Sequence, residues 1–166
     1  MSAPTSPPPS SPPSQPAWVC RAAEARDAPA LRRIAEAAYR PYIARMEKPP
    51  APISADYDAA IAARTVQVAT TAQGQPVGFI IHFARAEDWF VENLAIAPEA
   101  QGTGLGQHLL GLSEVAGAAA GYPALRLYTN VAMAEAVGFY RRLGYREIGK
   151  VHEEGFDRIY FERSLG

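Results

Sequence analysis

The chain has 166 residues, of which 48% are hydrophobic and 20% charged, and its formal net charge is -1. This balance is typical of a folded domain, excludes a disordered chain, and argues against nucleic acid as a main partner. A single cysteine, Cys20, excludes an intrachain disulfide, and no Cys/His cluster has zinc-like spacing, so we expect no metal.

The termini and the apolar segments bear on location. No apolar stretch approaches the roughly 20 residues that span a bilayer, and the N-terminus lacks the basic start and apolar segment of a secretory signal. We therefore expect no membrane partner and a cytoplasmic protein.

The domain boundary follows from composition. Residues 2–16 contain only Ser, Pro, Ala, Thr and Gln, with seven prolines. Such a segment forms neither a core nor a sheet. Residues 1–16 are therefore predicted to be a disordered tail, either a plain extension or a ligand for a proline-recognising module, and residues 17–166 a single domain.

The first half of the domain reads as a strand, two helices and a meander of three strands. The first helix begins at Asp27-Ala28-Pro29 and runs to about Tyr39, and Pro41 is expected to kink or end it. By alternation, Phe90, Glu92, Leu94 and Ile96 should share one face of the last strand. The remaining predicted elements are a strand over 18–22, a short helix over 54–62, and strands over 65–71, 76–83 and 89–97.

The second half adds two helices and three strands. Leucines and alanines at steps of three and four predict a helix over 105–119, followed by a strand over 124–129. Residues 89–129 thus form a strand–helix–strand crossover, which should be parallel and right-handed. A helix over 132–143 and a hairpin of strands 145–151 and 156–164 complete a mixed α/β domain with about seven strands.

The loop Gln101–Gly106 lies between a strand and a helix, and three of its six residues are glycine. Glycines let backbone N–H groups converge on a phosphate, and the helix dipole adds attraction for the anion. Neither the P-loop nor the G-x-G-x-x-G pattern is present. The loop is therefore predicted to bind a pyrophosphate of another kind, or else to be a plain strand–helix turn.

This loop, Gln-x-x-Gly-x-Gly, resembles the acyl-CoA pyrophosphate signature of the GNAT superfamily of N-acetyltransferases. Segments 92–98, 127–130 and 139–145 resemble other parts of that family in the same order. The resemblance covers Ala17 to Leu165 and implies a GNAT-like fold, a mostly antiparallel sheet with helices on both faces. It also implies acetyl-CoA as co-substrate, held by Leu94, Ala95, Ile96, Gln101, Gly102, Thr103, Gly104, Leu105, Gly106, Asn130 and Tyr140.

Two residues are candidates for proton transfer. Tyr140 resembles the family's general acid for the CoA thiolate; the alternative is an aromatic side chain packed in the core. Glu92, charged within an apolar strand, is the candidate base, directly or through water; the alternative is a surface glutamate. Asn130 could instead cap the next helix, and His108 could approach a phosphate or simply be solvated.

The acceptor is expected to enter between the first two helices and the final hairpin. The leading hypothesis is a primary amine of a small molecule; the alternatives are a protein lysine or N-terminal amine, and a non-catalytic acyl-CoA-binding regulator. A closed pocket would favour the small molecule and an open groove the protein. A homodimer is a family-based expectation. Candidate wall residues are Tyr39, Tyr42, Arg45, Tyr57, Tyr128, Glu153 and Glu154.

Overall fold

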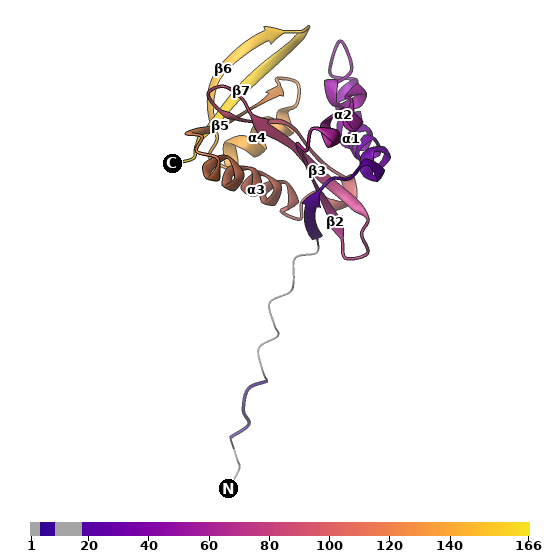
Figure 1. The fold of residues 1–166 in the computed structure, drawn as a ribbon, viewed down its shortest axis with the longest axis vertical. Coiled ribbons are helices and arrows are strands. Elements are labelled where there is room, and N and C mark those ends of the chain that lie inside the picture. Colours follow the sequence, from indigo (N-terminus) through magenta and orange to yellow (C-terminus); the bar gives the residue numbers. More distant parts are fainter. Residues whose placement is uncertain (1–3, 9–17) are drawn as a thin grey trace.

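The structure is a computed structural model that describes residues 4–8 and 18–166. Most of the predicted tail, residues 1–16, lies outside the described residues, and its described part, 4–8, has no helix or strand. The folded elements begin at Trp18 and continue to Ser164 (Figure 1).

A seven-stranded sheet forms the centre of the domain, in the order β1-β2-β3-β4-β5-β7-β6 (Figure 1). Strands β4 and β5 pair in parallel, and the other neighbours pair antiparallel. This confirms the predicted crossover and mixed sheet. The strands are β1 Trp18–Ala22, β2 Val66–Thr71, β3 Pro76–Ala84, β4 Trp89–Ile96, β5 Ala124–Asn130, β6 Arg146–Glu153 and β7 Phe156–Ser164.

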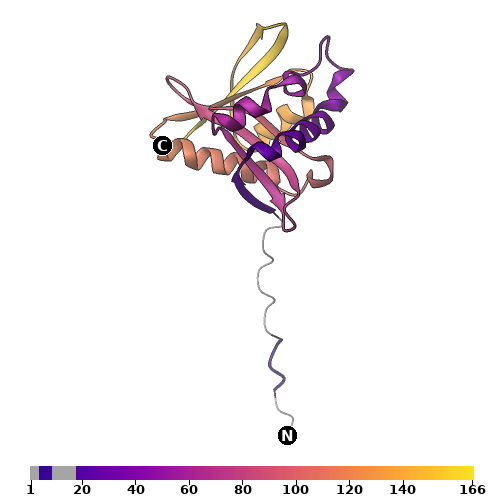
Figure 2. The same cartoon turned by 45° about the vertical axis from the view of Figure 1, so that its right-hand side comes forward.

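Four α-helices cover the two faces of the sheet (Figures 1 and 2). They are α1 Ala28–Ile43, α2 Tyr57–Ala62, α3 Leu105–Ala119 and α4 Ala134–Arg142. Tyr57 of α2 packs edge-on against Phe79 of β3, whereas Ser113 of α3 is hydrogen-bonded to His82 of the same strand. Because residues three apart in a strand point to opposite faces, α2 and α3 lie on opposite sides of β3, and the prediction of helices on both faces is confirmed.

The predicted end of the first helix is wrong, because α1 continues through Pro41 to Ile43. Proline removes one backbone N–H donor, and that loss is tolerated here because the helix ends two residues later. The second helix also begins later than predicted. Residues Ala51–Ser54 form a 3-10 turn, and Asp56 then caps α2 by accepting the Ala59 N–H at 3.0 Å.

Strand β4 contains a β-bulge at Glu92, which overturns the predicted common face of that strand. Val91 pairs with His82 and Asn93 pairs with Ile81, so Glu92 is an extra residue without a partner on β3. Phe90, paired with Phe83 in front of the bulge, lies on the α1/α2 face. The bulge reverses the alternation, so that Leu94 and Ile96 point to the α3/α4 face while Asn93 and Ala95 point to α1 and α2.

Candidate active site

A cavity of about 480 Å³ opens where β4 and β5 separate. The parallel pairing ends at Val91 and Leu127, although both strands continue beyond these residues. The bulge at Glu92 lies at this point, and bulges increase the local twist of a strand. The two strands therefore splay apart beyond Val91 and Leu127, and the splay begins at the bulge.

The edge of β4 that faces this gap carries the backbone groups of Leu94 and Ile96. The Ala97 N–H donates to Val77 O on β3 at 2.8 Å, and alternate residues of a strand direct their backbone groups to opposite edges. The Leu94 carbonyl accepts the Tyr39 hydroxyl at 3.2 Å, and the Ile96 carbonyl accepts Gln101 Nε2 at 3.1 Å. The N–H groups of these two residues thus face the cavity as donors.

The glycine loop forms the wall of the cavity at the start of α3. Gly102 and Gly104 have φ values of 77° and 88°, in the left-handed region that favours glycine. Gly104 precedes the first turn of α3, whose N–H groups therefore point toward the loop. Among the predicted residues, Thr103 does not line the cavity; its hydroxyl donates to Ala100 O at 2.6 Å. The loop residues that line the cavity are Gln101, Gly102, Gly104, Leu105 and Gly106.

Tyr140 of α4 has both a packing role and a place at the cavity. Its ring packs against Phe139, Tyr145 and Phe161, and only 8% of the residue is exposed. It also lines the cavity. Burial raises the pKa of Tyr140 far above its ordinary value, so the hydroxyl is protonated at neutral pH. Burial is also the largest cause of the raised pKa of Tyr39.

Glu92 lies on the bulge, is exposed to solvent and lines the cavity. Its charge contributes to raising the pKa of Tyr57 and Tyr128, although burial is the larger cause for each. Both tyrosines belong to the α1/α2 side of the sheet. Glu92 is thus a cavity-lining carboxylate on the bulge, between Val91 on the α3/α4 face and Asn93 on the α1/α2 face.

Asn130 lines the cavity at the end of β5 and also holds a turn. Its Oδ1 accepts the Ala132 N–H at 2.9 Å, whereas α4 begins only at Ala134. The side chain therefore stabilises the turn before the helix and does not cap the helix itself. His108, expected either to approach a phosphate or to be solvated, is exposed and does not line the cavity. Its ring packs against Trp18 at 4.9 Å between ring centroids.

Asn93 of β4 was not predicted as a site residue from the sequence. It links β4 to α1 and α2 on the acceptor side of the cavity, which is the part between the first two helices and the β6–β7 hairpin. It is 5% exposed; its Oδ1 accepts the Tyr39 hydroxyl at 2.9 Å, and its Nδ2 donates to the Tyr57 hydroxyl at 3.2 Å. Tyr57 in turn donates to Pro52 O at 2.5 Å. The bulge places this side chain on the α1/α2 face, so no alternation pattern could have identified it.

The acceptor side has walls from three regions of the chain. Of the predicted wall residues, Tyr39, Tyr42 and Tyr128 line the cavity, whereas Arg45, Tyr57, Glu153 and Glu154 do not. Two polar bridges span this side. Lys48 donates to Glu154 O and lies 4.3 Å from the centroid of the Phe156 ring, and Arg45 pairs with Glu135 at 2.9 Å. The segment after α1 is thereby tied to the β6–β7 hairpin and to α4.

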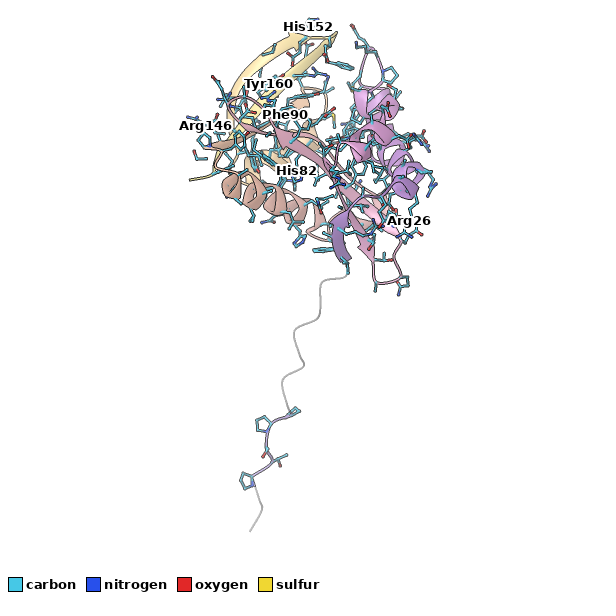
Figure 3. The ribbon with its side chains drawn as sticks, viewed as in Figure 1. Arg26, His82, Phe90, Arg146, His152 and Tyr160 are labelled. Atoms are coloured by element: carbon cyan, nitrogen blue, oxygen red, sulfur yellow. The ribbon has the colours of Figure 1, made fainter. Side chains whose placement is uncertain are left out.

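Arg158 of β7 is a cavity residue that was not predicted from the sequence. It lines the cavity and is only 5% exposed. Its guanidinium carbon lies 4.2 Å above the Tyr128 ring. The Tyr128 ring packs in turn against Phe90 and Tyr160, which are labelled in Figure 3. Burial lowers the pKa of Arg158, but Tyr128 and the glutamates of the hairpin together raise it above its ordinary value, so the side chain stays charged.

Comparison with known proteins gives the family. Residues 62–147 match the model of the acetyltransferase (GNAT) domain. The chain therefore belongs to the GNAT family of acetyltransferases and is an acyl-CoA-dependent N-acyltransferase, as its motifs predict. No curated protein matches the sequence.

Solved structures share the fold. PaiA N-acetyltransferase from Thermoplasma acidophilum, in complex with coenzyme A, has a TM-score of 0.73 at 19% identity, covering 89% of this chain and 98% of its own. Ard1 from Thermoplasma volcanium has a TM-score of 0.71 at 18% identity, covering 90% and 99%. The ribosomal-protein-S18-alanine N-acetyltransferase from Escherichia coli has a TM-score of 0.67 at 20% identity, covering 90% and 94%.

Two further features concern only the described part of the chain. It contains no group of three or more His, Cys, Asp or Glu side chains that could hold a metal ion. None of its helices is long and apolar enough to cross a membrane.

Proposed function

We propose that this protein transfers the acetyl group of acetyl-CoA to the primary amine of a small molecule by direct attack. One observation carries the proposal: one cavity is lined both by the edge of β4, the glycine loop and Tyr140, and by Glu92 and three further tyrosines. Groups suited to a thioester and groups suited to an amine thus meet in one space.

Each residue has a defined role in the proposed reaction. The glycine loop and the start of α3 bind the pyrophosphate, and the N–H groups of Leu94 and Ile96 donate to the amide-bearing arm and the thioester carbonyl. Glu92 accepts a proton from the ammonium, directly or through water. The amine nitrogen forms a bond to the acetyl carbon, the carbon–sulfur bond breaks, and Tyr140 gives its proton to the thiolate. The nitrogen, positively charged after its attack, releases its second proton through water, and Tyr140 regains a proton from water.

The two bridges from the segment after α1 favour a small acceptor over a protein chain. Lys48 and Arg45 tie this segment to the hairpin and to α4, which narrows the groove that a polypeptide would need. A protein N-terminal amine is the second candidate, because one structural neighbour is a ribosomal-protein-S18-alanine N-acetyltransferase. A homodimer and a cytoplasmic location stay predictions.

The test is release of free thiol from acetyl-CoA over a panel of small primary amines and short peptides. We expect turnover with small amines, and we expect kcat to fall about 100-fold in Glu92→Gln and in Tyr140→Phe, the usual contribution of one general acid or base. Glu36→Gln on the exposed side of α1 and Tyr122→Phe beside Trp89 are matched controls and should retain wild-type rates.

Other outcomes have distinct meanings. Turnover only with peptides would replace the small-molecule acceptor by a protein. Binding of acetyl-CoA without turnover on any amine would make the protein an acyl-CoA-binding regulator. Wild-type rates in Tyr140→Phe would leave Tyr140 with its packing role alone.

A further inference from the structure

Arg158 is a buried cation in the acceptor half of the cavity for which the proposed acetyl transfer has no use. It enters from β7, opposite Asn130 of β5, and 95% of its surface is covered. A charge at such a position is retained only where polar partners compensate its lost hydration. The guanidinium nitrogens of Arg158 that have no partner within the protein are therefore the ones available to a ligand.

The hydrogen bonds of the Arg158 side chain within the described residues all leave from Nη1. This nitrogen donates to Glu153 Oε1 at 3.2 Å and to Glu154 Oε2 at 3.1 Å. No fully buried side-chain nitrogen or oxygen of the described residues lacks a hydrogen-bond partner. Because Nε and Nη2 have no such partner, they are the atoms through which Arg158 reaches open space. Arg158 lines the cavity and also a smaller hollow beside Lys150 and Asp157. Its guanidinium lies over the rings of Tyr128 and Phe156, which line only the cavity, so the free edge faces the cavity.

The Nε–Nη2 edge of a guanidinium is a planar fork that matches a carboxylate with two parallel hydrogen bonds. The Tyr128 ring beneath the guanidinium holds its plane, since the guanidinium carbon lies 4.2 Å from the ring centroid. The competing glutamates do not occupy this edge, and Glu154 is 75% exposed, so its pairing with Nη1 is weakened by water.

Three other charged residues line the same cavity: Glu92, Glu135 and Arg142. Glu135 is already paired with Arg45, whereas Glu92 is the proposed base for the ammonium. A carboxylate for an ammonium and a guanidinium fork for an anion are the two groups that recognise a zwitterion. The cavity also has apolar and aromatic walls, formed by Tyr42, Met46 and Phe156. Such walls suit an uncharged side chain.

We propose that the acceptor is a free amino acid with an uncharged side chain, whose carboxylate binds the Nε–Nη2 edge of Arg158 while its amine faces Glu92. This inference rests on the proposed acetyl transfer and names its substrate class. Arg158 is then the residue that separates amino acids from simple amines and from peptides, in which the first residue has no free carboxylate.

The test compares acceptors that differ only in the carboxylate. L-phenylalanine and L-methionine are each measured against their primary amides, and phenethylamine serves as the acceptor without a carboxylate. We expect the wild type to prefer each acid over its amide by about 10- to 100-fold in kcat/KM, the range for hydrogen bonds to a charged group. In Arg158→Gln the acid and the amide should be used about equally.

Two further variants make the comparison specific. Arg158→Lys retains the charge but not the fork, and should show an intermediate preference for the acid. Arg146→Gln removes an exposed arginine of the edge strand β6, labelled in Figure 3, that does not line the cavity, and should retain the full preference. Protection by acetyl-CoA in a thermal melt verifies that each variant is folded.

Three outcomes would overturn the inference. Equal use of acid and amide by the wild type would remove the carboxylate from recognition while leaving acetyl transfer intact. An equal loss on acid and amide in both Arg158 variants would make Arg158 structural only. Absence of turnover on every acceptor, despite binding of acetyl-CoA, would refute the proposed function and the inference with it.

Discussion

Three tyrosines near the cavity, Tyr39, Tyr57 and Tyr140, have their hydroxyls removed from bulk water. Burial is the largest cause of the raised pKa of each, and for Tyr57 the value reaches about 12. Their hydroxyls therefore stay protonated and act as donors: Tyr39 shares its proton between Asn93 Oδ1 and Leu94 O, and Tyr57 donates to Pro52 O. For Tyr140 the same burial preserves the proton that the proposed transfer to the thiolate requires.

The raised pKa values predict a loss of stability in alkali. Below about pH 10 these tyrosines are protonated in both the folded and the unfolded chain, so their contribution is constant. Above that pH the unfolded chain releases protons first, and the free energy of unfolding falls as pH rises through the folded pKa, which is about 12 for Tyr57. Urea unfolding measured at increasing pH should show this decline.

A control separates Tyr57 from the other buried tyrosines. Tyr57→Phe cannot ionise, so its stability should decline less steeply than that of the wild type over the same range. Parallel curves for the two proteins would contradict the assignment of a raised pKa to Tyr57.

At the scale of elements, the packing of α3 on β4 positions the glycine loop, which precedes this helix. Gly117 of α3 lies so near Trp89 of β4 that an added Cβ would stand 2.8 Å from the ring carbon Cγ. At Gly111, in the same helix, nothing lies within 4 Å of an added Cβ. The close packing at Gly117 fixes the helix on β4, and with it the start of α3 at the glycine loop.

The same substitution in this one helix should therefore have opposite effects. Gly117→Ala forces a methyl group into Trp89 and should lower the free energy of unfolding by about 1–3 kcal/mol. Gly111→Ala restricts the unfolded chain and should raise it by about 0.5–1 kcal/mol. Urea unfolding of both variants is the measurement, and equal effects of the two substitutions would contradict the packing described for α3.

The bounds and faces of the elements were predictable where the hydrophobic periodicity is unbroken. They were predicted wrongly where a single residue interrupts it. The helix 105–119 has the same bounds in sequence and structure, because its leucines repeat at regular helical steps. The bulge at Glu92 was not predictable, since it adds a residue opposite β3 without changing the local pattern. Pro41 indicated a helix end that its position near the last turn did not require.

The residues of the candidate site were likewise predictable only in part. The glycine loop was predictable because its backbone requirement is visible as glycine in the sequence. Arg158 and Asn93 were not, because each depends on contacts between distant segments: Arg158 with Tyr128, and Asn93 with Tyr39 and Tyr57. A charged residue in an alternating strand resembles any solvent-facing position until its neighbours are known.

At the scale of the whole molecule, the cavity joins parts that the chain contributes separately. The bulge and splay of β4, the loop before α3 and the ring from α4 form one side, while the segment after α1 and the β6–β7 hairpin form the other. A cofactor bound between β4 and β5 would contact most of these parts only in the folded state. Binding must therefore be coupled to the stability of the entire domain.

The most direct test of this account is equilibrium unfolding with and without acetyl-CoA. At a concentration 100 times its dissociation constant, acetyl-CoA should raise the free energy of unfolding by about 2.7 kcal/mol. Gly104→Ala adds a Cβ to a residue of the loop whose φ of 88° lies in the left-handed region. The same acetyl-CoA concentration should therefore raise the free energy of unfolding of this variant by less. An unfolding curve that acetyl-CoA does not shift at any concentration would contradict the assignment of this cavity to the cofactor.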